Sequence, residues 1–343
     1  MSKYSDLRTA YGGFTVPAYK VFGAGSELSR SEFMIDGITV DNGMGKTAGA
    51  CAFTVHDVYE HGSGQFSQTA LDKLKPGSRI SLSLGYGSSV SEVFSGYVDE
   101  LAMRFDGENI CLSAVCLDAR ALMRLGARYT AAKGKTVQNI AESLLDLYSP
   151  LVSAKEVTLA ALEKEVCVTQ AGGDLDFIQD AADLRGHYFY IDCGKAYVGG
   201  AKDTVCVEFD WPDTELELGA RYVDLKITGM GYDHAKMEEF SSQKDAKGTQ
   251  KNLLAVTRII PLPPHLLGDA GKAVVAAAAD AAKREAVAGR VYCRGIPEVK
   301  LGQKIKINKC PFAALTGDRF TVVSVHHRMN SEDGFVTEIG IGG

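Results

Sequence analysis

The sequence lacks the features that mark membrane and secreted proteins. No stretch of its 343 residues approaches 18 apolar residues without a charge, and the alanine-rich segment 273–282 is short and carries Asp280. The N-terminus, Met1 to Asp6, has no apolar h-region of a signal peptide. We therefore expect a protein made in the cytoplasm, with no membrane-spanning segment.

Proline is scarce and acidic residues exceed basic ones. Only nine prolines argue against long polyproline linkers, whereas 37 glycines indicate many tight turns. A formal net charge of −6 argues weakly against nucleic acid or an anionic membrane as the main partner. The 45% of hydrophobic and 23% of charged residues are typical of globular proteins, and the length favours two domains.

Eight cysteines are present, but none forms a C-x-x-C pair. They are Cys51, Cys111, Cys116, Cys167, Cys193, Cys206, Cys293 and Cys310. Most lie in apolar runs, and their scatter along a long chain argues against a disulfide framework. We expect reduced thiols buried in a cytosolic protein.

One glycine-rich segment looks like the end of a phosphate-binding loop: Gly43-Met44-Gly45-Lys46-Thr47. The full motif needs a glycine where Val40 stands, and a helix after the loop so that backbone amides surround the phosphates. The following residues 51–55 have the pattern of a strand instead. The segment therefore predicts a loop between two strands.

Histidines give no metal-binding pattern. His326 and His327 are neighbours on a predicted strand, so they point to opposite faces and cannot share a metal. His56 and His61 fit a solvated loop better than a metal site. Two further histidines, His187 and His234, stand beside tyrosines and are expected at the surface or an edge.

Catalytic motifs are missing as well. His61-Gly62-Ser63-Gly64 lacks the spacing of a nucleophile elbow. The acidic pair Asp99-Glu100 fits a strand edge, and Asp174 with Asp176 fits a helix N-terminus. We therefore predict no catalytic, cofactor-binding or metal-binding residues, no cofactor and no enzymatic activity.

The first third of the chain is predicted to be β. Short runs rich in β-branched and aromatic residues are separated by turn residues, at 15–22, 33–40, 50–58, 79–86, 92–104 and 109–117. A helix is predicted over 66–74, before Pro76-Gly77, and a short helix or turn over 117–126. This spacing favours a small barrel or sandwich.

The middle of the chain changes to a helical pattern. Apolar spacing predicts a helix over 136–148 with Thr136 as N-cap, and another over 173–186 with Gly186 just beyond it. A hairpin follows over 188–198, with its turn at 192–195. We read this part as a small α+β unit.

The last part returns to β. Strands are predicted at 204–210, 222–230, 290–295, 303–308, 318–329 and 334–341. A polar segment, 238–252, is predicted to be a mobile loop, and an alanine-rich helix is predicted over 269–288. The predicted domains are a first β-barrel (1–126), a small α+β domain (127–203) and a second β-barrel (204–343).

The second β region echoes the first. Residues 75–84 and 300–309 share the pattern K-x-G-x-[RK]-I-x-[LI]. Phe94 to Val98 loosely matches Phe320 to Val325, and Asp106-Gly107 corresponds to Asp333-Gly334. Two unrelated hairpins could also look alike. If the similarity is an internal duplication, three chains would present six similar barrels to a six-fold partner.

Lysines cluster at the start of the second copy: Lys300, Lys304, Lys306 and Lys309. The even-numbered ones would share one face of a strand. That face could line a pore, or the lysines could protect a solvated edge strand from aggregation.

Three stretches, taken in order, resemble a known family. They are 75–101, with Lys75 to Ile80 and then F-S-G-Y-V; 174–199, a short helix and an aromatic hairpin; and 289–341, with G-I-P-E-V-K-L-G and a closing hairpin through His326 and Gly334. Together they resemble the late-control protein D family, the baseplate hub of contractile phage tails. That family is related to the hub part of type VI secretion spike proteins.

The resemblance implies a structural role. It implies a homotrimer forming a pseudo-six-fold ring that connects a spike protein below to the inner tube or tube-initiator proteins above, beside other baseplate (wedge) proteins. The particle could be a phage tail, a tailocin or an injection system, assembled in the bacterial cytoplasm. No spike or lysozyme domain follows the second barrel before Gly343, so we expect the spike to be a separate protein.

Two alternatives to a baseplate hub stay open from the sequence. One is a cell-wall-degrading or other hydrolytic enzyme of a phage particle, and the other is a β-rich carbohydrate-binding protein or adhesin.

Overall fold

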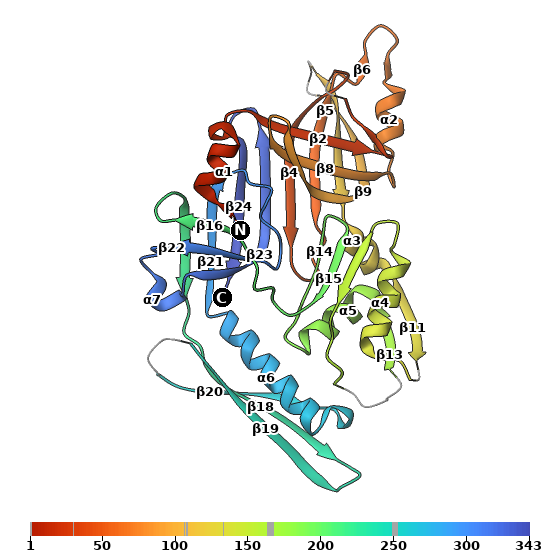
Figure 1. Cartoon of the computed structure of the whole chain (residues 1–343). Helices are drawn as coiled ribbons and strands as arrows, with labels where there is room; N and C mark the ends of the chain where they lie inside the picture. The colour runs from red at the N-terminus through yellow and green to blue at the C-terminus, as the bar shows by residue number, and fades with distance from the viewer. Residues whose placement is uncertain are drawn as a thin grey trace.

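The fold is mainly β, with a small α+β unit between two β-rich parts (Figure 1). The computed structural model describes residues 2–29, 31–105, 107, 109–132, 134–162, 168–248 and 253–343. This architecture confirms the predicted fold class. Among the described residues each β-rich part remains an open set of strands, and no pairing closes it into a barrel.

The first β-rich part, called here the first repeat, has six strands in the order β4-β5-β10-β9-β8-β2. Their bounds are Pro17–Gly23 (β2), Met34–Gly43 (β4), Ala50–His56 (β5), Arg79–Tyr86 (β8), Ser89–Phe105 (β9) and Ile110–Leu117 (β10). Every second side chain of β5 is buried, as expected for a strand with one face on a core. All six predicted strands are confirmed, as is the predicted helix, α2 (Gln68–Leu74).

The second repeat has its six strands in the order β17-β21-β24-β23-β22-β16. Their bounds are Val205–Asp210 (β16), Glu215–Ala220 (β17), Val287–Arg294 (β21), Lys304–Asn308 (β22), Arg319–Asn330 (β23) and Gly334–Gly342 (β24). In both repeats the strands, numbered along the chain, lie in space as second, third, sixth, fifth, fourth, first. The predicted internal duplication is therefore confirmed for the order of the strands, with one difference: β2 pairs antiparallel with β8, whereas β16 pairs parallel with β22.

Backbone hydrogen bonds match between the repeats residue by residue. The Gly77 N–H donates to the Val98 oxygen at 2.8 Å, and the equivalent Gly302 N–H donates to the Val322 oxygen at 3.0 Å. One residue further along β9 and β23, the ladder to the next strand skips Asp99 and Val323 respectively, so each repeat has a β-bulge at the same place. An unrelated pair of hairpins would not share both features.

The predicted match of Phe94 with Phe320 is wrong by two residues. The turn glycine and the bulge make Gly96, not Phe94, the equivalent of Phe320. The aromatic side chains misled the alignment because each core fills its space from a different position. Of the predicted turns, Gly107 and Gly334 both have positive φ, and Asp106 lies outside the described residues.

The two repeats meet along one seam, where β23 pairs antiparallel with β4. Ser324 lies opposite Gly43, and Met329 lies opposite Ile38. The seam joins both repeats into a single sheet.

The middle unit contains three helices and two small sheets, β11-β13 and β12-β15-β14. Its elements are Ala119–Leu125 (α3), Ala127–Ala132 (β11), Val137–Leu147 (α4), Ala154–Val157 (β12), Val168–Gly173 (β13), Asp174–Asp183 (α5), Tyr188–Asp192 (β14) and Lys195–Gly199 (β15). Thr136 caps α4 in a capping box with Asn139, as the sequence predicted for its N-cap. Gly186 after α5 has φ 64°, as its predicted position requires.

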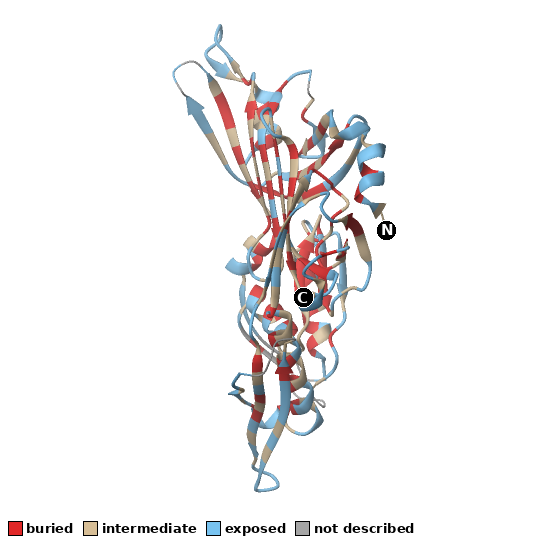
Figure 2. Cartoon of the chain, turned by 90° about the vertical axis from the view of Figure 1, so that its left-hand side faces the viewer, coloured by how far each residue is buried: buried red, intermediate tan, exposed pale blue. Residues whose placement is uncertain are grey.

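A three-stranded arm with one helix projects from the second repeat (Figures 1 and 2). It consists of β18 (Asp224–Asp233), β19 (Glu238–Lys247), β20 (Val256–Pro261) and α6 (Asp269–Arg284). The loop predicted over 238–252 is wrong for 238–247, because these polar residues hydrogen-bond to β18 along ten register pairs. The remainder, 249–252, lies outside the described residues. The predicted helix 269–288 ends earlier, since β21 begins at Val287.

Several short elements were missed by the sequence patterns. They are β1 (Ser2–Lys3), α1 (Tyr4–Ala10), η1 (Gly12–Phe14), β3 (Ser26–Glu27), β6 (Tyr59–Glu60), β7 (Gln65–Phe66), η2 (Pro264–Leu266) and α7 (Ala313–Thr316). These elements are too short for a periodic pattern to develop. The longer strands β11, β12, β13, β17 and β20 were also missed. Helix α1 is held by tertiary packing, because Tyr4 and Leu7 join the core of the second repeat.

In the part of the chain that the structure describes, none of the helices combines the length and the apolar character needed to cross a bilayer. The domain boundaries predicted near 126 and 203 stay predictions.

The two equivalent turn glycines give a matched test of packing. Both have positive φ, 89° at Gly77 and 75° at Gly302. A Cβ at Gly77 would meet nothing within 4 Å, whereas one at Gly302 would come within 2.3 Å of the Tyr190 hydroxyl. Gly77→Ala should cost about 1 kcal/mol from backbone strain alone, and Gly302→Ala about 1–3 kcal/mol more. Thermal melting followed by circular dichroism measures both, and equal losses would contradict the packing argument.

Candidate functional site at the seam

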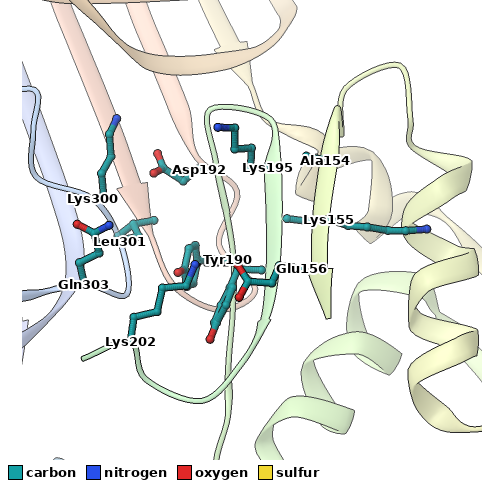
Figure 3. Close-up of a pocket in the computed structure, with 12 residues that line it drawn as sticks. Ala154, Lys155, Glu156, Tyr190, Asp192, Lys195, Lys202, Lys300, Leu301 and Gln303 are labelled. Atoms are coloured by element: carbon teal, nitrogen blue, oxygen red, sulfur yellow. Dashed lines mark hydrogen bonds and ion pairs between the residues drawn. The ribbon is translucent and has the colours of Figure 1, made fainter. Parts of the chain in front are cut away.

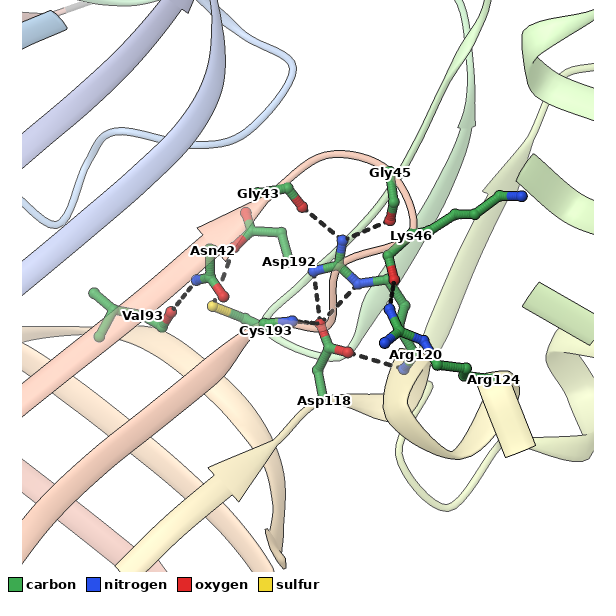
Figure 4. Close-up of polar contacts among 11 residues, drawn as sticks. Asn42, Gly43, Gly45, Lys46, Val93, Asp118, Arg120, Arg124, Asp192 and Cys193 are labelled. Atoms are coloured by element: carbon green, nitrogen blue, oxygen red, sulfur yellow. Dashed lines mark hydrogen bonds and ion pairs between the residues drawn. The ribbon is translucent and has the colours of Figure 1, made fainter. Parts of the chain in front are cut away.

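The glycine-rich loop that follows β4 lies at the seam, and its carbonyls face a buried arginine (Figure 4). Arg120 Nη1 donates to the Gly43 oxygen at 2.6 Å and to the Gly45 oxygen at 3.1 Å. The guanidinium also binds Asp118 at 2.7 Å, and the side chains of this ion pair are 0% and 3% exposed. Asp118 in turn accepts a hydrogen bond from the Gly49 N–H.

This orientation decides the chemistry of the loop. A phosphate-binding loop turns N–H groups toward an anion. Here two carbonyl oxygens point at a cation, and the N–H groups of Met44 and Gly45 donate to the backbone oxygens of Val323 and Phe189. The prediction of a loop between two strands is confirmed.

Lys46 holds the same loop to helix α5. Its Nζ lies 2.7 Å from Asp176 and 3.4 Å from Asp180. The hydrogen bond to Asp176 raises the pKa of Lys46. Arg124 donates to the Lys46 carbonyl at 2.6 Å. Residues 43–49, called here the junction loop, thus bind both repeats and the middle unit to one another.

Asp174, predicted only as a favourable residue at a helix N-terminus, is the centre of a second buried network. Its carboxylate accepts hydrogen bonds from Arg128 at 2.9 Å, Tyr148 at 2.7 Å and Gln170 at 2.7 Å. Burial, followed by the bond to Asp174, raises the pKa of Tyr148 to about 12. The network fixes β13, α4 and the start of α5, so its role is structural.

The adjacent histidines of β23 lie on opposite faces, as predicted. His326 is on the open face, where it binds Asp41 of β4 across the seam. That hydrogen bond raises the pKa of His326. His327 is buried, and desolvation lowers its pKa to about 3. Its Nδ1 lies 2.8 Å from the Thr337 hydroxyl, which also accepts a hydrogen bond from the Ile296 N–H.

Of the remaining histidines, His61 lies in an exposed turn as predicted, whereas His56, predicted in a loop, is the last residue of β5. His61 and His234 contact the rings of Tyr59 and Tyr232 edge-on. Burial lowers the pKa of His187, which is half-buried. Among the described residues no group of three or more His, Cys, Asp or Glu side chains is placed to hold a metal ion.

A pocket of about 460 Å³ lies between the β14–β15 hairpin and the segment before β22 (Figure 3). Four lysines and two carboxylates line it: Lys155, Lys195, Lys202, Lys300, Glu156 and Asp192. Lys202 binds Glu156 at 2.9 Å and lies 4.1 Å from the ring centroid of Tyr197. The described lining residues include no Ser, Cys or His.

The lysine cluster is only partly on a strand. Lys304 and Lys306 belong to β22, and Lys304 binds Asp203 at 2.6 Å. Lys300 precedes the strand and donates to the Glu92 oxygen at 3.0 Å. The expectation that Lys300 shares the face of β22 is therefore wrong, because the turn at Gly302 separates it from the strand.

Seven of the eight cysteines are described, and all seven are free thiols, as predicted. Burial raises the pKa of Cys116 to about 12 and makes it a poor nucleophile. Cys167 lies outside the described residues.

Solved structures with the same fold are phage tail and secretion proteins. A tail protein from Neisseria meningitidis MC58 aligns over 96% of this chain and 97% of its own, with a TM-score of 0.67 and 12% identity. The 43 kDa tail protein of prophage MuSo2 from Shewanella oneidensis aligns over 95% and 98%, with a TM-score of 0.68 and 13% identity. The E. coli c3393 protein, a component of the type VI secretion system, aligns over 94% and 76%, with a TM-score of 0.57 and 10% identity.

The fold is thus that of this class of tail proteins. A family model described as the Alg8 N-terminal domain matches residues 14–331, which is most of the chain, and the protein belongs to that family. A comparison with curated proteins finds no match.

The buried ion pair of the junction should be costly to break. Asp118→Ala leaves the Arg120 guanidinium buried without a carboxylate, and we expect a loss of about 3–5 kcal/mol in the free energy of unfolding. Asp118→Leu combined with Arg120→Met should recover only part of the loss, because it removes the buried charge but leaves the Gly43 and Gly45 carbonyls and the Gly49 N–H without these partners. Urea denaturation measures these values. Lys46→Met, which removes an exposed ion pair, is the control and should cost below about 1 kcal/mol. A loss for Asp118→Ala no larger than the control would refute the role of the pair.

The two histidines of β23 should respond to pH in opposite ways. His327 has a folded pKa of about 3 against an ordinary value of 6.5, so below pH 6.5 the unfolded state binds a proton that the folded state does not. Stability should fall by up to about 1.4 kcal/mol per pH unit between these values, and His327→Asn should remove that slope. Because the folded pKa of His326 is raised, its contribution is present below pH 6.5 and is lost above it.

Urea denaturation at pH 5.5 and pH 8 separates the two histidines. His326→Asn should destabilise the protein at pH 5.5 more than at pH 8, whereas His327→Asn should reduce the acid sensitivity. Identical pH slopes for both variants would show that the two environments are not as described.

Proposed function

We propose that the protein is the structural hub of the baseplate in a contractile phage tail or a related injection particle. Three chains form a ring, and the ring connects a separate spike protein to the inner tube or its initiator, with wedge proteins outside. The protein is not an enzyme in this proposal. It is made in the bacterial cytoplasm and assembled into the particle there.

The observation that carries the proposal is the internal repeat. Two sets of six strands share one spatial order, one turn and one bulge, and they are joined edge to edge. A chain with two similar units has the form needed to place six units around an axis with three copies. The fold shared with phage tail proteins and a type VI secretion component supports the same assignment.

The polar groups of the seam support a structural role. The buried charges Asp118, Arg120 and Asp174 are all bound by partners within the chain, which is typical of structural networks. In this proposal residues 1–126 and 204–343 are the two domains that form the ring of the trimer, and residues 127–203 are a smaller domain between them.

Assembly is the direct test. We expect native mass spectrometry at micromolar concentration to show a trimer of about 110 kDa, three times the 36.7 kDa chain, with a six-lobed ring in electron-microscopy class averages. If the chain stays monomeric even with its spike and tube proteins present, the proposal is wrong. Lysis of cell walls in zymography by the purified protein would replace it with the hydrolase alternative.

A further inference from the structure

Strand β23 forms the internal seam, and its equivalent in the first repeat, β9, lacks a second partner strand at the corresponding residues in the described part of the chain. Residues 324–329 of β23 pair with β24 on one side and with β4 on the other. The equivalent residues of β9, 100–105, pair with β10, but the pairing with β8 ends at Tyr97. Within the described residues no strand occupies the second side of this half of β9. It is a free edge of six residues.

Over the residues that the structure describes, the strand equivalent to β4 also lacks a second partner strand, although helix α7 lies beside it. β17 pairs with β21, and among the described residues it has no other partner strand. In the strand order β17-β21-β24-β23-β4-β5-β10-β9, the strands β17 and β9 lie on opposite sides of the seam, at the two ends of this series. Each chain therefore has the two strand edges that a seam needs, one on β9 and one on β17. Because they lie on opposite flanks, they cannot pair with each other within one chain.

The free edge of β9 carries large apolar side chains that are exposed to solvent. Met103 is 62% exposed and Phe105 is 64% exposed. Their equivalents in the second repeat, His327 and Met329, are 2% and 6% exposed, because β4 and the residues around it cover them. Large apolar side chains exposed in a row on an unpaired strand indicate an interface.

We propose that β17 of one chain pairs antiparallel with residues 100–105 of β9 in the next copy of the chain, and so repeats the internal seam between subunits. The ladders of the two repeats fix the register. Val40 and Leu218 occupy equivalent positions, since their partners Cys51 and Gly289 do. Because His327 lies opposite Val40, Met103 lies opposite Leu218.

This register, derived from the backbone alone, gives complementary side chains. Apolar residues meet on the core face: Leu101 with Ala220, Met103 with Leu218, and Phe105 with Leu216. On the open face Arg104 lies opposite Glu217, and opposite charges across a strand pair are favourable. A slip by two residues would place Arg104 opposite Gly219 in one direction and opposite Glu215 in the other, so the backbone ladders, rather than the side chains, decide between these registers.

The interface is head-to-tail, because a chain offers β9 on one flank and β17 on the other. Such an interface forms a ring if the rotation from one copy to the next closes on itself, and an open filament if it does not. This inference rests on the proposed function for the number of copies, three, and it adds which strands meet and in what register.

Charge exchange tests the contact. Arg104→Glu and Glu217→Arg should each place like charges opposite one another and raise the apparent Kd of assembly about 3- to 10-fold per interface. The double variant Arg104→Glu/Glu217→Arg should restore the wild-type value. Arg258→Glu, an exposed strand arginine on the arm, is the matched control and should leave assembly unchanged. Native mass spectrometry over a dilution series gives the Kd.

Cysteine cross-linking tests the register. Met103→Cys with Leu218→Cys should form covalent dimers and trimers under mild oxidation, since directly opposed residues of antiparallel strands have the spacing of a disulfide. Met103→Cys with Leu216→Cys, slipped by two residues, should not. Each single cysteine variant controls for the native thiols.

The outcomes separate this inference from the proposed function. If the trimer is equally stable in both charge-reversal variants, or if it cross-links only in the slipped register, the proposed strand pairing is wrong but the proposed hub function stands. A chain that remains monomeric under all conditions, with its partner proteins present, overturns both.

Discussion

The structure depends on the pairing of β23 with β4. Strand β23 is longer than its own repeat requires, and its second half would be an exposed edge if β4 of the other repeat did not cover it. Every other connection is built around this seam. The carbonyl of Gly43, the last seam residue of β4, accepts a hydrogen bond from Arg120. The next residue, Met44, donates its N–H to the carbonyl of Val323. The seam and the middle unit are therefore held by one set of contacts.

Much of this fold could be predicted because alternating side chains reveal half-buried strands. Apart from β17, which the sequence patterns missed, the strands of both repeats and the capped helix after Thr136 follow local rules, and the shared pattern around Gly77 and Gly302 revealed the duplication. Segment 238–247 was wrongly predicted because its polar residues resemble a loop, although ladder bonds to β18 hold it as a strand. Tertiary packing overrides local preference there, as it does in the short helix α1.

The candidate site was harder to predict, because its chemistry depends on the orientation of peptide groups. The letters of the junction loop resemble a phosphate loop, but the carbonyls of Gly43 and Gly45 are turned to a cation. Arg120 was missed because an isolated arginine in a short helix forms no motif. Its one signal in the sequence was Asp118 two residues before it, with apolar residues on either side that are buried here, such as Cys116 and Met123.

The internal seam also determines which unit can leave a ring of such chains when the ring is diluted. Its two strands belong to one polypeptide, so their effective concentration does not change with dilution. A contact between β9 and β17 of separate chains has no such tether, so dissociation begins there. The unit released is always a whole chain with both repeats still joined. Covalent continuity thus makes alternate joints of the ring permanent and leaves the others reversible.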